Sequence, residues 1–242
     1  MANGQLSRAE ALACSGCRHA CHVMLYSDTK SQLFGRIPIR HIILMQMRFD
    51  GMLGFPGGFV NQSQESLEAG LCRELEEEVG VALSISEDDH MDAQHAPGTS
   101  PSSPRLITHF YVKKLEEEQI REVEKASVST ATDHGQEVLY SMCVIDCSQS
   151  HVPVFPITFL KVLGMVRVPL YTTKGGGGLS SFLSHTFIGN ARSQLVNSLL
   201  RLHLVSPEDL RKALKHSLKM HARSAVDVQA VLKLTEAERE QS

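Results

Sequence analysis

The sequence predicts an α/β domain, because apolar strand-like runs alternate with amphipathic helical stretches. Residues 19–26 (HACHVMLY) and 40–49 (RHIILMQMRF) are apolar and partly β-branched, which is typical of buried strands. Over residues 67–79, Leu, Leu, Leu and Val recur at every fourth position and give one apolar stripe along a helix. With 242 residues, 42% of them hydrophobic, the chain can bury one sizeable core and does not require two domains.

Turn-forming residues separate the elements of the first half. Asp50-Gly51 is a strong turn pair and predicts a hairpin from the second run into residues 52–55. The segment 54–58 (GFPGG) then forms a glycine-rich loop before the helix over 67–79. Gly80 stands where a C-cap glycine ends a helix.

The second half continues the alternation of strands and helices. Residues 97–104 predict a loop, 105–112 a strand and 114–126 a charged surface helix. Further elements follow in order: a strand over 164–171, a break at the four glycines 175–178, a helix over 189–203, and an amphipathic helical tail from Ser206 with Pro207 in its first turn.

A segment near residues 140–163 interrupts this pattern. Glu137 begins a strand, but residues 140–163 stand between Leu139 and the strand at 164–171. This insert either loops out from a strand junction or displaces Glu137 and the following strand. The pair Val-Leu on both sides, at 138–139 and 162–163, suggests a duplicated junction such as alternative splicing produces.

Charge and composition exclude some classes of protein. A net charge of −3 and a pI near 6.5 exclude a globally basic nucleic-acid coat, although a local basic patch stays open. No apolar run approaches the roughly 18–20 residues of a membrane span, and no secretory signal begins the chain. Six cysteines without such a signal indicate a reducing compartment, so we expect a soluble intracellular protein without a membrane partner.

The acidic helix 67–79 carries the chemistry. Glu74, Glu77 and Glu78 stand at i, i+3 and i+4, so their carboxylates share one face. Hard divalent cations such as Mg²⁺ and Mn²⁺ prefer oxygen ligands and would turn this repulsion into coordination, while Arg73 orients one carboxylate. The alternative is a solvated acidic face. The glycines that flank the helix favour a metal site, because they let backbone groups approach an ion closely.

This segment resembles the Nudix box, G-x5-E-x7-R-E-U-x-E-E-x-G-U, in which U is aliphatic. The matching residues are Glu65, Arg73, Glu74, Leu75, Glu77, Glu78, Gly80 and Val81. The first glycine departs from the pattern by one, since six residues separate Gly58 from Glu65. Further stretches resemble the branch of the Nudix superfamily that contains snoRNA-decapping enzymes, which also hydrolyse inosine and deoxyinosine di- and triphosphates. These stretches are 19–26, 33–60, 133–139, 164–171 and 186–195.

The resemblance implies a Nudix α/β/α sandwich with a mixed sheet over residues 10–205, interrupted by the insert. It leaves residues 206–242 as an unexplained helical C-terminal extension. It also implies a homodimer that uses Mg²⁺ or Mn²⁺. Its expected location is the nucleus, nucleolus and nucleoplasm, with the cytoplasm as an alternative.

The same resemblance assigns the site residues. The metal ligands would be the Gly57 carbonyl, Glu74, Glu77, Glu78 and His95, and the catalytic residues Glu77, Glu78 and Glu137. Glu137 would be a further acidic residue near the metals, such as a general base. Nucleotide contacts would come from His22, Arg48, Phe55 and Gln194. The residues alone leave alternatives: a core role for Phe55, a surface ion pair for Arg48 and a buried, satisfied histidine at position 22.

The expected reaction cleaves a phosphoanhydride bond by in-line attack on phosphorus. Capped snoRNA or mRNA would give a methylated guanine nucleotide and a 5′-monophosphate RNA, and inosine diphosphate would give the monophosphate and phosphate.

Two other interpretations compete with this one. Cys14 and Cys17 form a C-x2-C pair, but a zinc site would need Cys143 and Cys147 as second pair. The second is a catalytically weak or inactive RNA- or protein-binding module on the same fold. A relative of the branch resembles such a module and lacks the box glutamates, whereas this chain keeps all three.

Overall fold

The computed structural model describes residues 5–96, 105–129, 162–172 and 178–219, together with the backbone of 137–138 and 158–159. The strands are β1 (Gln5–Leu6), β2 (Arg18–Asp28), β3 (Gln32–Leu33), β4 (Ile37–Pro38), β5 (His41–Arg48), β6 (Leu53–Gly54), β7 (Gly57–Val60), β8 (His90–His95), β9 (Leu106–Lys114), β10 (Glu137–Val138), β11 (Thr158–Phe159) and β12 (Val162–Leu170). The helices are α1 (Arg8–Leu12), α2 (Leu67–Val79), the 3₁₀ turn η1 (Glu87–Asp89), α3 (Glu117–Ser129), α4 (Leu179–Phe182), α5 (Ala191–Arg201) and a helix over 207–219.

A mixed sheet forms the centre of the fold. Its main path runs β1-β8-β9-β2-β5-β12, with β6 beside β5 and β7 beside β2. The β2–β9 pair is parallel and the other pairs are antiparallel. Strands β2 and β5 coincide with the two apolar runs, and the Asp50-Gly51 turn leads into β6 as predicted, with Gly51 at φ 76°.

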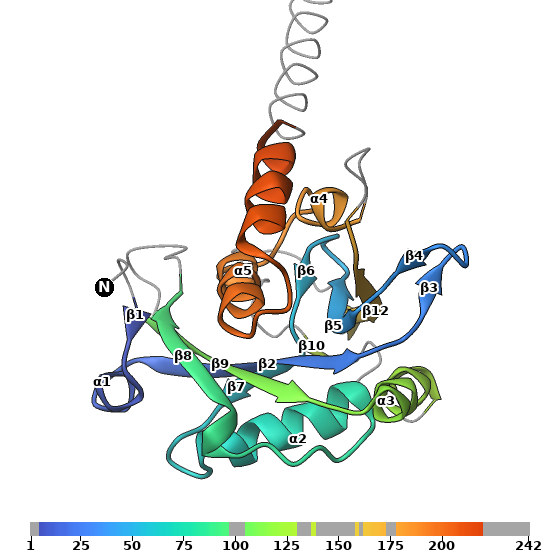
Figure 1. The fold of residues 1–242 in the computed structure, drawn as a ribbon. Coiled ribbons are helices and arrows are strands. Elements are labelled where there is room, and N and C mark those ends of the chain that lie inside the picture. Colours follow the sequence, from blue (N-terminus) through green and yellow to red (C-terminus); the bar gives the residue numbers. More distant parts are fainter. Residues whose placement is uncertain are drawn as a thin grey trace, which may run out of the picture.

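Helices cover both faces of this sheet, as Figure 1 shows, with α2 and α3 on one side and α4 and α5 on the other. Each face has its own apolar core. Leu71 and Leu75 of α2 pack with Val23 and Leu44 from the sheet, whereas Leu195 of α5 packs in the other core. The α/β/α sandwich expected from the sequence is therefore confirmed.

Helix α2 begins and ends where its sequence predicts. The Ser66 hydroxyl accepts a hydrogen bond from the Ala69 N–H (3.1 Å) and caps the N-terminus. Gly80 takes the left-handed conformation (φ 74°) that ends the helix, which few other residues adopt without strain. These caps fix the register of the acidic residues along the helix.

The helix expected over 114–126 starts later than predicted. Lys114 is the last residue of β9, and the Leu115 N–H donates to the Tyr26 carbonyl (2.8 Å), which continues the sheet. α3 is also more than a surface helix, because Ile120 and Val123 are fully buried against the α2 face. The predicted loop at 97–104 lies outside the described residues.

The chain after α5 packs back on the domain. The helix over 207–219 places Leu210 and Ala213 in the α5-side core, and Arg192 donates to the Ser217 hydroxyl (3.0 Å). No helix within the described ranges is long and apolar enough to cross a membrane.

Candidate active site on helix α2

Two carboxylates of α2 point into the molecule rather than into solvent. Glu74 and Glu78 are 8% and 5% exposed, one turn apart, on the side of the helix that faces the sheet. Glu77 is half-buried and Glu76 is exposed. Burying two like charges side by side costs free energy unless they have donors or a cation as partners. This arrangement is the predicted acidic face.

The glycine loop supplies some of those donors. The Gly57 N–H and the Gln46 side-chain amide each donate to Oε2 of Glu78, both at 2.9 Å. A Cβ atom on Gly58 would lie 2.1 Å from Oε2 of Glu74, so only glycine permits this approach. Backbone from β7 therefore touches both buried carboxylates and fixes their positions.

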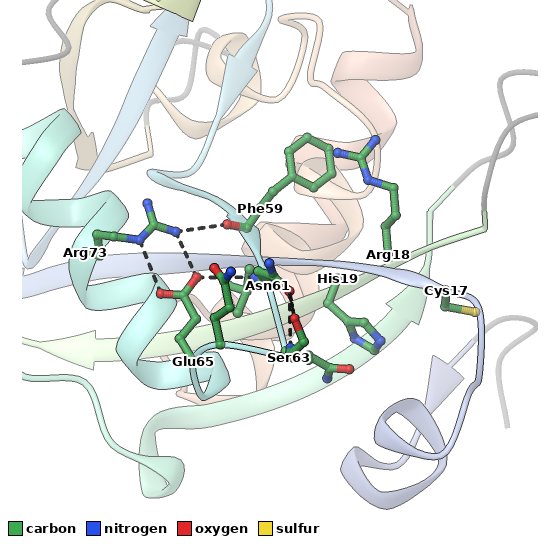
Figure 2. Close-up of a pocket in the computed structure, with 11 residues that line it drawn as sticks. Cys17, Arg18, His19, Phe59, Asn61, Ser63, Glu65 and Arg73 are labelled. Carbon is green, nitrogen blue, oxygen red and sulfur yellow. Dashed lines mark hydrogen bonds and ion pairs between the residues drawn. The ribbon is translucent and has the colours of Figure 1, made fainter.

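Arg73 holds the outer part of the same face. Its guanidinium contacts Glu74 at 2.8 Å, Glu77 at 3.3 Å and Glu65 at 3.0 Å. Hydrogen bonding to Glu65 is the main cause of the raised pKa of Arg73, and Arg73 in turn lowers the pKa of Glu65. Figure 2 shows Arg73 between the Glu65 carboxylate and the Phe59 carbonyl. Glu65 keeps a defined role despite the loop that is one residue longer than the motif: it orients Arg73.

The donors here are chemically suited to a hard divalent ion. Within the described ranges, no group of three or more His, Cys, Asp or Glu side chains is arranged to hold a metal ion. Mg²⁺ seldom needs such a group, since it is commonly bound by one or two carboxylates plus substrate phosphates and water. Glu74 and Glu78, with glycine backbone pressed against them, fit that donor set, and the glycines make room that a side chain would fill.

Three of the residues predicted to contact the nucleotide lie on the opposite face of the sheet from these glutamates. Cys21 and Val23 pack against α2, so His22 between them points toward α5. Gln194 of α5 is 3% exposed and faces the same core. Phe55 belongs to that core as well, with its ring 4.9 Å from the ring of Phe110. The structure thus places Phe55 in the core, the alternative considered for it. Its contact with a base stays a prediction.

Other predicted site residues lie at the margins. Arg48, at the end of β5, makes a paired contact with the Asp50 carboxylate (3.0 and 2.9 Å), the surface ion pair considered as its alternative. His95 is exposed at the end of β8 and is not grouped with the α2 glutamates. Only the backbone of Glu137 is described, in β10, which pairs with β11.

A hollow of about 680 Å³ opens beside the first turn of α2, and the sequence did not indicate it. It is lined by Cys17, Arg18, His19, Phe59 to Glu65 and Arg73. The Arg18 guanidinium lies 3.9 Å from the centre of the exposed Phe59 ring, and Figure 2 shows the two side chains next to each other. Neither Gln46 nor Phe59 was singled out from the sequence, although a glutamine inside an apolar strand is a signal that could have found Gln46.

The structure does not favour the zinc interpretation. Cys21 is buried in the α2-side core while His22 points to the other face, as strand alternation predicts. Cys14 and Cys17 are free thiols, and the pKa of Cys17 is raised by a hydrogen bond to Cys14. Cys143 and Cys147 lie outside the described residues.

The mixed sheet between two helical layers and the glutamate-bearing helix behind a glycine loop define a protein of the Nudix class. Family comparison makes this specific: the family described as Nudt16-like, U8 snoRNA-decapping enzyme-like, matches residues 19–151 and 158–205. The chain belongs to this family.

Similar proteins carry two different names. The chain is 42% identical to the U8 snoRNA-decapping enzyme of Xenopus laevis over 216 residues, covering 88% of each chain, and 46% identical to that of Bos taurus, covering 79% of this chain and 85% of the other. It is also 41% identical to the human Tudor-interacting repair regulator protein, covering 87% and 86%. Among solved structures, the NUDIX domain of Shewanella oneidensis NrtR aligns over 81% of this chain and 99% of that one at 16% identity and a TM-score of 0.42.

Proposed function

We propose that this protein is a divalent-metal-dependent hydrolase that removes caps from snoRNA or mRNA and converts inosine and deoxyinosine di- and triphosphates to monophosphates. The observation that carries the proposal is the Glu78 carboxylate, buried on α2 and held by Gly57 and Gln46 beside the equally buried Glu74. The names of the decapping relatives support RNA caps as the substrate class.

Each residue of the site has a defined task in this reaction. Glu74, Glu78 and the Gly57 carbonyl would hold Mg²⁺ or Mn²⁺, with Glu77 as a further ligand. A divalent ion supplies neutralisation of the phosphate charges and a lowered pKa for the attacking water. Glu77 or Glu137 would accept the proton of the attacking water. Arg73 keeps Glu74 and Glu77 in place, because its guanidinium contacts both.

Binding of the base would use the other face of the sheet, and Arg48 at the end of β5 would contact a phosphate. His22 and Gln194 would contact the base, and Phe55 would border it. Arg48 would exchange its contact with Asp50 for a substrate phosphate, since a guanidinium forms the same paired contact with either anion. A metal-proximal role for His95 would require the β8 end to approach the phosphates.

A substrate panel tests the proposal. Purified full-length protein is incubated with inosine di- and triphosphate, capped RNA and ADP-ribose in Mg²⁺ or Mn²⁺, and products are separated by chromatography. We expect cleavage of the inosine nucleotides and the cap, and its loss with a chelator. Protein that cleaves none of these substrates with either metal would overturn the proposal.

A binding module on the same fold is the second candidate. The likeness to the Tudor-interacting repair regulator protein favours it, whereas the retained Glu74, Glu77 and Glu78 favour the enzyme. The same panel distinguishes the two candidates, because a binding module would bind RNA or protein but hydrolyse no substrate of the panel.

We further propose a nuclear and nucleolar homodimer, on the strength of the family resemblance alone. Light scattering of the purified protein measures the dimer directly, and imaging of the tagged chain in cells measures its location.

A further inference from the structure

Cys14 and Cys17 form a pair of thiols that neither the metal site nor the proposed reaction uses. Both side chains are free and partly exposed, and the two thiols hydrogen-bond to each other. A hydrogen bond places the two sulfur atoms close together, so little movement is needed to join them. Zinc would need further ligands, and the described ranges contain no group of three or more His, Cys, Asp or Glu side chains arranged to hold a metal ion. The pair therefore has the chemistry of a dithiol.

The backbone between the two cysteines has a geometry that allows a disulfide. Ser15 and Gly16 are the central residues of a tight turn, and Gly16 takes the left-handed conformation (φ 74°). The first and last Cα atoms of such a turn lie less than about 7 Å apart. The Cα atoms of two disulfide-bonded cysteines are usually separated by about 4.4–6.8 Å. The turn thus brings Cys14 and Cys17 within range of a covalent bond.

An oxidant can reach this pair from solvent. Cys17 lines the hollow beside α2, and Figure 2 shows it where the chain enters β2. The hydrogen bond to Cys14 raises the pKa of the Cys17 thiol, and the nearby charge of Arg105 opposes this effect. Since thiols react as thiolates, mildly alkaline pH favours the reaction. Cys21, by contrast, is fully buried, and burial raises the pKa of its thiol, so it is inert.

The turn joins α1 to the sheet. Both cysteines pack against a small core at this end of the domain, which consists of Ala11, Ala93 and Ile107. From α1, the Arg8 guanidinium contacts the Glu68 carboxylate (2.8 Å) in the first turn of α2. A bond across the turn would restrain α1 relative to β2. Through Arg8, it would also restrain the start of the helix that carries the buried glutamates.

We propose that Cys14 and Cys17 form a reversible disulfide that fastens the N-terminal segment, β1 and α1, to the sheet under oxidising conditions. In reducing compartments such bonds are usually transient and belong to catalytic or redox-sensing proteins. The inference goes beyond the proposed hydrolase function and does not depend on it.

Exchange with glutathione disulfide supplies the oxidising equivalents. The thiolate of one cysteine attacks a sulfur of glutathione disulfide, forms a mixed disulfide and releases one glutathione. The second cysteine, as thiolate, attacks the protein sulfur of the mixed disulfide, forms the Cys14–Cys17 bond and releases the second glutathione. The two protein thiols are thereby oxidised and glutathione disulfide is reduced. Each released glutathione thiolate takes up one of the two protons.

Mass spectrometry of tryptic peptides tests the bond. Arg8 and Arg18 bound a peptide that contains both cysteines and no other. Full-length protein is equilibrated at mildly alkaline pH with either glutathione disulfide or a dithiol reductant, and the remaining thiols are then alkylated in denaturant. We expect this peptide to lose two hydrogens and to carry no alkyl group after oxidation, and to be alkylated twice after reduction.

Two variants and a control distinguish a disulfide from two separately reactive thiols. Cys14→Ser and Cys17→Ser each leave one thiol of the pair, which should carry glutathione after oxidation. Cys72, a partly exposed cysteine on α2, lies in a different tryptic peptide. Cys72→Ser should therefore form the Cys14–Cys17 bond to the same extent as the wild-type protein.

Hydrogen exchange measures the fastening of the N-terminal segment. The Ala11 and Ala13 amides donate to the Ser7 and Ala9 carbonyls (2.9 and 3.0 Å), so their exchange reports the opening of α1. We expect this exchange to slow by at least about threefold in oxidised wild-type protein, because the bond restricts the opened chain. Cys14→Ser should show no difference between the two treatments.

The outcomes decide each part of the inference. A wild-type peptide that is alkylated twice after both treatments, or that carries glutathione on each cysteine, would overturn the bond. A bond that forms but leaves the exchange of α1 unchanged would overturn the fastening. Neither measurement uses turnover, so a failure of the proposed hydrolase function and a failure of this inference are distinguishable.

Discussion

At the scale of single residues, three neighbouring histidines near the N-terminal end of β2 are notable for their burial. Nδ1 of His19 and Nε2 of His109 are 2.9 Å apart and share one proton, and the rings of His90 and His109 lie 5.7 Å apart. Both His19 and His109 are almost fully buried. Arg8, Glu68 and Glu87 are the charged groups that act on them, and the Tyr111 ring packs edge-on against His90.

This cluster predicts a loss of stability in mild acid. Burial is the main cause that lowers the pKa of His19, His90 and His109, to about 3 for His109. The unfolded chain binds these protons near pH 6.5, so stability is fully present above that pH and falls as the pH drops toward the folded-state pKa. We expect the free energy of unfolding in urea to be about 2 kcal/mol lower at pH 5 than at pH 7 from His109 alone.

Between pH 7 and 5 the histidines account for the loss of stability, while Asp92, whose pKa is raised by burial, acts in the opposite direction. The carboxyl groups with lowered pKa values, such as Glu68 and Asp89, gain protons only below their ordinary values near 4.5 and 3.8. His109→Gln should flatten the pH dependence whatever its effect on absolute stability. Equal free energies of unfolding at the two pH values would contradict this account.

Sequence reasoning predicts some residues of the candidate site because their chemistry follows a helical period. Glu74 and Glu78 stand one turn apart, and the flanking glycines set them apart from an ordinary charged helix. The role of Gln46 could not be predicted, because it depends on the packing of β5 against α2. No local spacing in the sequence encodes such a contact between elements.

At the scale of elements, the helix over 207–219 belongs to the packed domain. Leu210 is 2% exposed within the α5-side core, whereas Leu218 on the same helix is 66% exposed. The amphipathic pattern of the tail predicted a helix but not its position, because the partner surface comes from α4, α5 and the sheet together. Residues 220–242 lie outside the described part of the chain.

Truncation of these two leucines measures that packing. Leu210→Ala should lower the free energy of unfolding by about 3 kcal/mol, because it removes buried contacts and leaves a cavity. Leu218→Ala, the matched control, should change it by less than about 0.5 kcal/mol. Equal effects of the two substitutions in urea unfolding would show that the helix does not pack as described.

Strand β8 shows where the sequence pattern fails for an element. Its residues, HMDAQH, lack the apolar alternation of β2 and β5, so no strand was predicted there. Asp92 and Gln94 point toward α5 in positions that apolar residues would normally fill.

At the scale of the whole molecule, two paired strands flank most of the insert near 140–163. Glu137 pairs with Phe159 and Val138 with Thr158 in the antiparallel β10–β11 ladder. This pairing supports the looping-out alternative, because it closes the base of the segment. Most of the segment itself lies outside the described residues.

Shortening the insert tests this arrangement. Deleting residues 142–155 leaves five residues, 139–141 and 156–157, between the paired ends, a length that hairpin loops commonly have. We expect the shortened protein to hydrolyse inosine diphosphate within about twofold of the full chain, since loop length has a small effect on stability. Loss of hydrolysis in a folded deletion protein would mean that the insert contributes to the site.

The most direct test of the central claim compares two glutamates of α2 in metal-dependent cleavage of capped RNA. Glu78→Gln alters the buried carboxylate that Gly57 and Gln46 position, and Glu76→Gln alters an exposed carboxylate on the same helix. A divalent ion stabilises the transition state by several kcal/mol, so Glu78→Gln should lower the rate by at least about 100-fold, whereas Glu76→Gln should match the wild-type protein. Full metal-dependent cleavage by a folded Glu78→Gln protein would contradict the account.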